Sequence, residues 1–201
     1  MKSIVFILLI GIGATLVMDL WALLRKQLFG IAPTNWGMVG RWIGHMRKGQ
    51  FRHTSISSAH AVHGESTIGW TAHYLIGIAY AALLIFICGE SWLFEPTLGP
   101  AVAAGIATVV APFFILQPGM GAGIAASKTP NPNNARLHSI INHVVFGVGL
   151  YLSALLIRLL LSIWLLTTND DLSELQLIMA IKQHAFIRRQ DENFTGRNKQ
   201  I

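Results

Sequence analysis

Four apolar runs of hydrocarbon length constrain this chain more than any other feature of its sequence. A helix of about 20 residues crosses the roughly 30 Å hydrocarbon core of a bilayer. Because backbone polar groups inside lipid must be bonded within the protein, each run is predicted to be a helix. The runs cover about residues 4–24, 67–88, 99–116 and 137–166. The expected fold is all-α, a four-transmembrane-helix bundle that forms one membrane domain over residues 1–166.

The composition supports this class, because hydrophobic residues make up 53% of the chain and charged residues only 12%. A soluble domain usually carries about twice that share of charge. The net charge of +6 belongs to the connecting segments, and without a basic binding face it does not indicate nucleic-acid binding. The lipid bilayer is therefore the expected partner. The single cysteine, Cys88, excludes an intramolecular disulfide.

The charges of the connections predict the orientation. Residues 25–66 are polar and basic, whereas residues 89–98 contain two glutamates and no Lys or Arg. By the positive-inside rule, the basic loop 25–66 lies in the cytoplasm and both termini lie outside. Within that loop, residues 36–46 place tryptophans and aliphatic side chains at helical spacing. This pattern is typical of an amphipathic helix lying in the interface, or of a loop anchored by tryptophans.

Residues 167–201 form a polar tail. Asp171 and Glu174 resemble a capping box, and apolar residues up to Phe186 predict a short amphipathic helix. The charged segment 188–201 that follows is predicted to be disordered.

Polar residues near the inner ends of the four runs are the candidate site, because ionisable groups within a span are costly and often functional. Asp19 ends the first run, Gln117 ends the third, and His73 and His143 lie at the starts of the second and fourth. All four lie within about two helical turns of the inner boundary. We expect Asp19, His73 and His143 to meet in one cluster.

Small residues at four-residue steps predict the helix faces that pack closely. Gly11 and Thr15 precede Asp19 in this way, and Gly77 and Gly147 follow the two histidines. In the third run, a face of small residues is expected at Ala103, Ala107 and Ala111, with a bend at Pro112.

Several functions fit such a cluster. A carboxylate and imidazoles near neutral pH suit the proton or ion site of a small-solute or ion permease. The same groups are ligands for a divalent metal, with His60, His63 and Glu65 as possible additions, and His73 with His143 would suit a haem. The cluster is also consistent with simple helix–helix hydrogen bonds, as in an accessory subunit without a site of its own.

No catalytic residues and no cofactor are predicted, and the permease is the leading interpretation. A homodimer is expected to be possible, because four helices barely enclose a pathway. Gly119, Gly121 and Gly123 with Lys128 fail the P-loop pattern. They fit either a backbone nest for an anion or lipid headgroup, or a tight turn at the membrane surface.

Four segments of the sequence are distinctive: GATLVMDLWALL, NWGMVGRWIGH, GWTAHYLIGIAYA and APFFILQPGMGAGIAASKTPNPNNARLHSIINHVVFGVGLYL. They resemble the DUF2938 family of bacterial integral membrane proteins. The resemblance covers about residues 4–160, and the run QPGMGAGIAASKTPNP is its most specific part. It implies a bacterial inner-membrane protein with no characterised activity, so it assigns no site residues.

Overall fold

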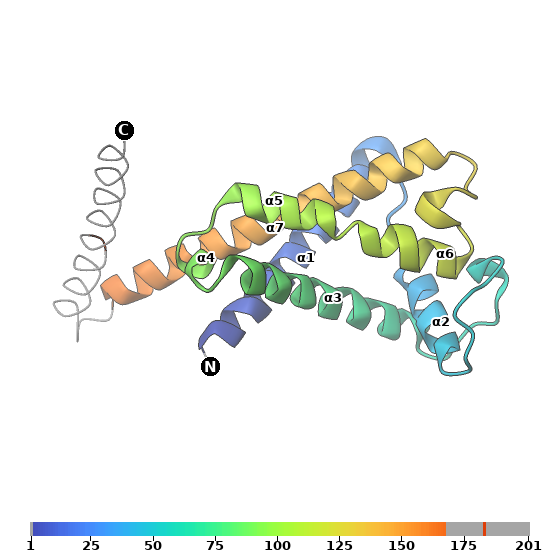
Figure 1. Ribbon diagram of the computed structural model, residues 1–201, viewed down its shortest axis with the longest axis horizontal. Coiled ribbons are helices and arrows are strands. Elements are labelled where there is room, and N and C mark those ends of the chain that lie inside the picture. Colours follow the sequence, from blue (N-terminus) through green and yellow to red (C-terminus); the bar gives the residue numbers. More distant parts are fainter. Residues whose placement is uncertain (1, 168–182, 184–201) are drawn as a thin grey trace, which may run out of the picture. The chain divides into compact units, whose positions relative to one another are not determined.

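The computed structural model describes residues 2–167 and 183, and within this part all regular secondary structure is helical, with no strands (Figure 1). The chain divides into two compact units, residues 1–158 and 159–201. The long helices are α1 (Lys2–Phe29), α2 (Trp36–Met46), α3 (Glu65–Cys88), α5 (Leu98–Ala107) and α7 (Pro132–Thr167). The short elements are η1 (Ile56–Ser58), α4 (Ser91–Phe94), η2 (Pro112–Leu116), α6 (Gln117–Met120) and η3 (Ile124–Ala126).

Within the described residues, four helical segments are long and apolar enough to cross a membrane: Ser3–Phe29, Glu65–Cys88, Leu98–Met120 and Pro132–Trp164. Large apolar side chains remain exposed on their outward faces, for example Leu20, Phe86 and Ile115 at 64%, 86% and 61%. Such surfaces suit lipid and not water. The predicted all-α class with four membrane-spanning helices is thus confirmed, and the protein is a multi-pass membrane protein.

The ends of the spans differ from the expected ones in two informative ways. The helix α1 continues to Phe29. Arg25 therefore belongs to the first span, whereas the sequence predicted it in the basic loop. The third span is not a regular α-helix: α5 ends at Ala107, a turn follows at residues 108–109, and the π-helical turn η2 begins at Pro112, where a bend was predicted. Proline has no backbone N–H to give to the preceding turn, and a π-turn accommodates that loss.

Close backbone contacts hold the first unit together. A methyl group at Gly77 of α3 would collide with the Thr15 side chain of α1, and one at Gly147 of α7 would meet the backbone of α5 at Ala101 and Val102. Small residues therefore set these helix crossings, as predicted. On α5, however, the expected face is wrong: Ala103 and Ala107 are exposed. The buried positions are Ala101, Gly105 and Thr108, because Gly105 has to face α7.

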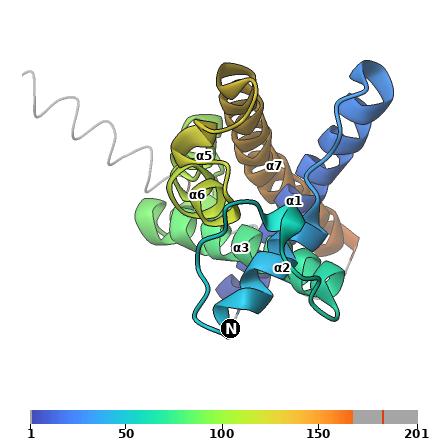
Figure 2. The same ribbon diagram turned by 90° about the vertical axis from the view of Figure 1, so that its right-hand side faces the viewer.

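The helix α2 covers the end of α3 (Figure 2). Asn35 caps it by accepting a hydrogen bond from the Met38 backbone N–H. A methyl group at Gly40 would collide with the α3 backbone, and Val39 and Trp42 are buried. The prediction of a helix over 36–46 is therefore confirmed. Its apolar face packs on protein, which corrects the expectation that it would face the lipid interface.

Both long connections lie at one end of the first unit. Figure 1 shows α2, α6 and the start of α7 at this end, and α4 and the start of α1 at the other. The end that holds α2 is called the basic end below, because the connections there carry Arg47, Lys48, Arg52 and Lys128. The predicted tail helix and the disordered segment lie outside the described residues, apart from Gln183.

Candidate functional site

Asp19 and His73 lie together, and the structure adds a third group to them. His73 Nε2 lies 2.9 Å from Asp19 Oδ1, and the Tyr74 hydroxyl donates a hydrogen bond of 3.0 Å to Asp19 Oδ2. Both oxygens of the carboxylate are therefore bonded to α3. We call these three residues the Asp19 network. It is partly buried, since the Asp19 and His73 side chains are 20% and 5% exposed.

Two tryptophans enclose His73 on its other sides. The Trp36 ring stacks on the imidazole with centroids 3.8 Å apart and 21° between the planes. Trp70 meets the imidazole edge-on at 5.8 Å. Trp36 is the first residue of α2, so the packing of α2 on α3 places its ring against His73. The imidazole of His73 is thus held between the Asp19 carboxylate and the face of the Trp36 ring.

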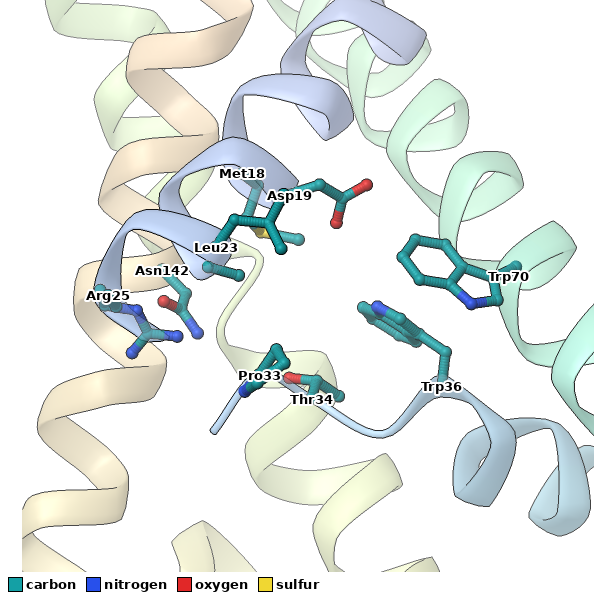
Figure 3. A pocket seen from close by; sticks show the side chains of 10 residues that line it. Met18, Asp19, Leu23, Arg25, Pro33, Thr34, Trp36, Trp70 and Asn142 are labelled. Carbon is teal, nitrogen blue, oxygen red and sulfur yellow. The ribbon is translucent and has the colours of Figure 1, made fainter. Parts of the chain in front are cut away.

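A pocket of about 160 Å³ opens next to this network (Figure 3). Asp19 and Arg25 of α1, Trp36, Trp70 and Asn142 of α7 contribute to its lining. Pro33 and Thr34, which are exposed, line it from the connection between α1 and α2. The pocket is thus reachable from the basic end of the unit, and it joins one carboxylate, one guanidinium and two indole rings.

Arg25 was not among the predicted site residues, because the basic loop was expected to begin with it. In the structure its side chain is buried, with 5% exposure. Its Cζ lies 5.9 Å from the centroid of the Trp21 ring, and its Nη1 lies 3.5 Å from His138 Nδ1. Leu28 and Phe29 extend the first apolar run beyond Arg25, but an arginine near a span end usually extends toward headgroups, so nothing in the sequence signals that this side chain is buried.

His143 and Gln117, which were predicted to join Asp19 and His73, have other partners. His143 Nδ1 lies 2.8 Å from the hydroxyl of Thr108, which directly follows α5, and the Gln117 amide donates to Ser139 of α7 at 3.3 Å. The structure therefore brings together Asp19 and His73 as predicted, whereas His143 bonds to Thr108 and not to these two residues.

The other proposed metal ligands, Glu65, His60 and His63, do not join the Asp19 network either. Glu65 accepts two hydrogen bonds of 2.8 Å from Arg41 and a third from the Val62 backbone N–H. The bonds to Glu65 raise the pKa of Arg41 above its ordinary value. His60 and His63 are exposed. Over residues 2–167, no group of three or more His, Cys, Asp or Glu side chains is placed to hold a metal ion.

The glycines of the predicted anion nest pack against protein. A methyl group at Gly119 would enter the Trp42 indole, and one at Gly121 would meet the backbone of Thr54. Gly121 and Gly123 have φ of +96° and +76°, which glycine adopts without strain. Lys128 is exposed. These contacts favour the tight-turn interpretation of the segment.

The comparisons with known proteins give one match. A family model described as a protein of unknown function, DUF2938, matches residues 8–157. This range includes the Asp19 network and the whole lining of the pocket. No curated protein matches the chain. No solved structure matches it either.

Proposed function

This chain belongs to the DUF2938 family, which has no assigned function, and on that premise we propose that it is a small-solute permease. The Asp19 network is its proton site, and the adjoining pocket is its solute site. One observation carries the proposal. An imidazole and a phenol of one membrane span are both hydrogen-bonded to a carboxylate of another span, and this carboxylate lines a pocket.

The cost of this arrangement supports a functional role. A charged group within a bilayer is unfavourable by about 3 kcal/mol or more, and such residues usually line the path of an ion or a solute. Simple helix–helix adhesion does not require them, because Gly77 and Thr15 already bring α1 and α3 into contact. Histidine gains and loses its proton near neutral pH, which suits a coupled step.

The pocket and the proton site share residues, and this gives a route for coupling. Asp19 and Trp36 contact His73 and also line the pocket. A solute that moves the Trp36 ring changes the surroundings of the imidazole, and protonation of the imidazole changes the charge that faces the solute. By linkage, each event then alters the affinity for the other.

We also propose that the basic end faces the cytoplasm of a bacterial inner membrane, with the N-terminus outside. The support is the charge of the connections at that end, together with the two glutamates of the connection between α3 and α5. Single cysteines at Gln50 and Ser91 in a Cys88→Ala background test this orientation. An impermeant maleimide added to intact cells should label position 91 and leave position 50 unlabelled until lysis. The reverse pattern would overturn the orientation.

Proton movement in proteoliposomes tests the permease. The full chain is reconstituted with a trapped pH indicator, and small carboxylates, amino acids, amines and sugars are added in turn. We expect at least one class to move protons, and Asp19→Asn and His73→Gln to reduce that rate at least tenfold. Glu90→Gln and His63→Gln are matched controls, since both residues are exposed and neither belongs to the Asp19 network.

Two outcomes would refute the permease. In one, no class of solute moves protons faster than in empty liposomes. In the other, Asp19→Asn and His73→Gln transport normally but unfold at lower temperature. The second result would assign the network to helix adhesion alone.

A further inference from the structure

Arg25 is a buried cation without a counter-charge. Its guanidinium lies within the first span, and its side chain is 5% exposed. Its Nε is buried and has no hydrogen-bond partner. Among the residues that the structure describes, no carboxylate forms an ion pair with Arg25, in contrast to the pairs of Arg41 with Glu65 and of His73 with Asp19. A buried charge is normally paired, because its desolvation is costly.

A second unpartnered polar group lies beside it. Asn142 Oδ1 is buried and has no hydrogen-bond partner. Figure 3 shows the Asn142 amide next to the Arg25 guanidinium on one side of the pocket, and Trp36 and Trp70 on the other. The oxygen and nitrogen of an amide can exchange places by rotation, so the amide N–H groups are available to the same ligand as the guanidinium.

The shape of the pocket limits what that ligand is. An apolar cavity of about 150 Å³ holds a benzene molecule, so a pocket of about 160 Å³ takes a compact solute. Its aromatic wall suits an apolar body and its single guanidinium suits a single negative charge. The planar fork of arginine matches a carboxylate through two parallel hydrogen bonds.

We propose that the pocket binds a small monocarboxylate with an apolar tail. The carboxylate lies on Arg25 and Asn142, and the tail lies against Trp36 and Trp70. This inference rests on the proposed function in taking the pocket as the solute site, and it adds the class of solute. It also explains why a proton would move with the solute, because a monovalent anion and one proton together cross the membrane without net charge.

An amino acid is the main competing ligand, since its ammonium group would face Asp19. Both oxygens of Asp19 already accept hydrogen bonds from α3, so the ammonium group would have to share them. The observations therefore favour the monocarboxylate, and leucine serves as the competing probe.

Calorimetric titration of the full chain in lipid nanodiscs tests the inference, with benzoate as the probe. Benzyl alcohol has the same shape without charge, and benzylamine carries the opposite charge. We expect benzoate to bind most tightly of the probes. Arg25→Gln should weaken benzoate binding at least tenfold and leave the weak binding of benzyl alcohol unchanged. Arg52→Gln is the matched control, because Arg52 is an exposed arginine of the loop.

Further variants keep the test decisive if Arg25→Gln does not fold. Arg25→Lys keeps the charge and removes the fork, and Asn142→Ala removes the amide, so each should weaken benzoate binding several-fold. The inference is overturned if benzoate binds equally to the wild type and to these variants, or if leucine or benzylamine binds more tightly than benzoate.

The two proposals fail in different ways. Benzoate binding that depends on Arg25, without proton-linked uptake of any solute, would refute the permease and retain the carboxylate site. Proton-linked uptake of an uncharged or cationic solute that Arg25→Gln does not affect would refute the carboxylate site and retain the permease.

Discussion

The substitution Gly77→Ala tests how helix packing supports the site. Gly77 lies one turn after His73 on α3, and Thr15 lies one turn before Asp19 on α1. A methyl group at Gly77 would overlap the Thr15 hydroxyl and would lie 3.3 Å from the Gly11 carbonyl oxygen. The Thr15 hydroxyl is not free to turn away at no cost, since it donates a 2.7 Å hydrogen bond to Gly11. The two helices must therefore separate at this level.

The structure sets the size of the effect. Overpacking a tight contact by one methyl group costs about 1–3 kcal/mol. A separation of about 1 Å would stretch the contact between His73 and Asp19 beyond the range of a hydrogen bond, starting from its present 2.9 Å. We thus expect Gly77→Ala to lower both the stability and the proton-linked activity.

Unfolding in detergent by heat or by sodium dodecyl sulfate measures the loss of stability. Gly99→Ala is the matched control, because a methyl group there meets nothing within 4 Å, and alanine favours a helix over glycine by up to about 1 kcal/mol. Adding Thr15→Ala to Gly77→Ala should restore at least half of the loss, since it removes the hydroxyl that the methyl group strikes. If Gly77→Ala is as stable as Gly99→Ala, or if Thr15→Ala does not rescue it, the reasoning is wrong.

Three further predictions concern neighbouring contacts. Glu65→Ala removes the two bonds that join Arg41 to α3 and leaves its bond to the Ala59 carbonyl of the loop. The helix α2 should therefore loosen, and trypsin should cleave after Arg47 and Lys48 faster than in the control His63→Gln. An unchanged cleavage rate would contradict this role of Glu65. Gly121→Ala forces a side chain onto a residue with φ of +96° and into the Thr54 backbone, so it should lower the melting temperature. The control is Gly49→Ala, at an exposed residue with φ of +74° and nothing within 4 Å, which should show only the cost of the backbone conformation. Thr108→Val removes the hydroxyl next to His143 and should cost about 1 kcal/mol of stability without changing the proposed proton-linked transport. A loss of transport at full stability would instead connect His143 to the Asp19 network.

The ends of the apolar runs predict the depth of the polar residues, whereas their rotation about each helix axis could be predicted only in part. Each residue adds about 1.5 Å along a helix, so the ends of the apolar runs give the depths of Asp19, His73 and His143. Which neighbour each side chain faces depends on the helix crossings. Gly105 and Gly147 bring α5 against α7, and this contact places His143 beside Thr108.

The aromatic and cationic parts of the site lay beyond the sequence for two physical reasons. Trp36 belongs to a connection, and only the packing of α2 on α3 brings it to His73. Arg25 is a charged residue of the kind expected in a loop, but it lies in the last turns of the first span. Lysine and arginine near a span end usually extend toward headgroups, and nothing in the sequence distinguishes this buried arginine from such a residue.

The helix α1 carries both charged walls of the pocket and so decides how they cooperate. Asp19 and Arg25 are six residues apart, which separates them by about 9 Å along the axis and about 120° around it. Asp19 accordingly bonds to α3, while Arg25 lies beside His138 of α7. A carboxylate on Arg25 would strengthen the contact of α7 with α1, and a proton on His73 would place a cation beside the Asp19 carboxylate and strengthen the contact of α3 with the same helix. A ligand shifts an equilibrium between two states only if it binds them with unequal affinity. The helix α1 has one such contact on each side, so an anion and a proton would together favour the state in which both contacts are tight.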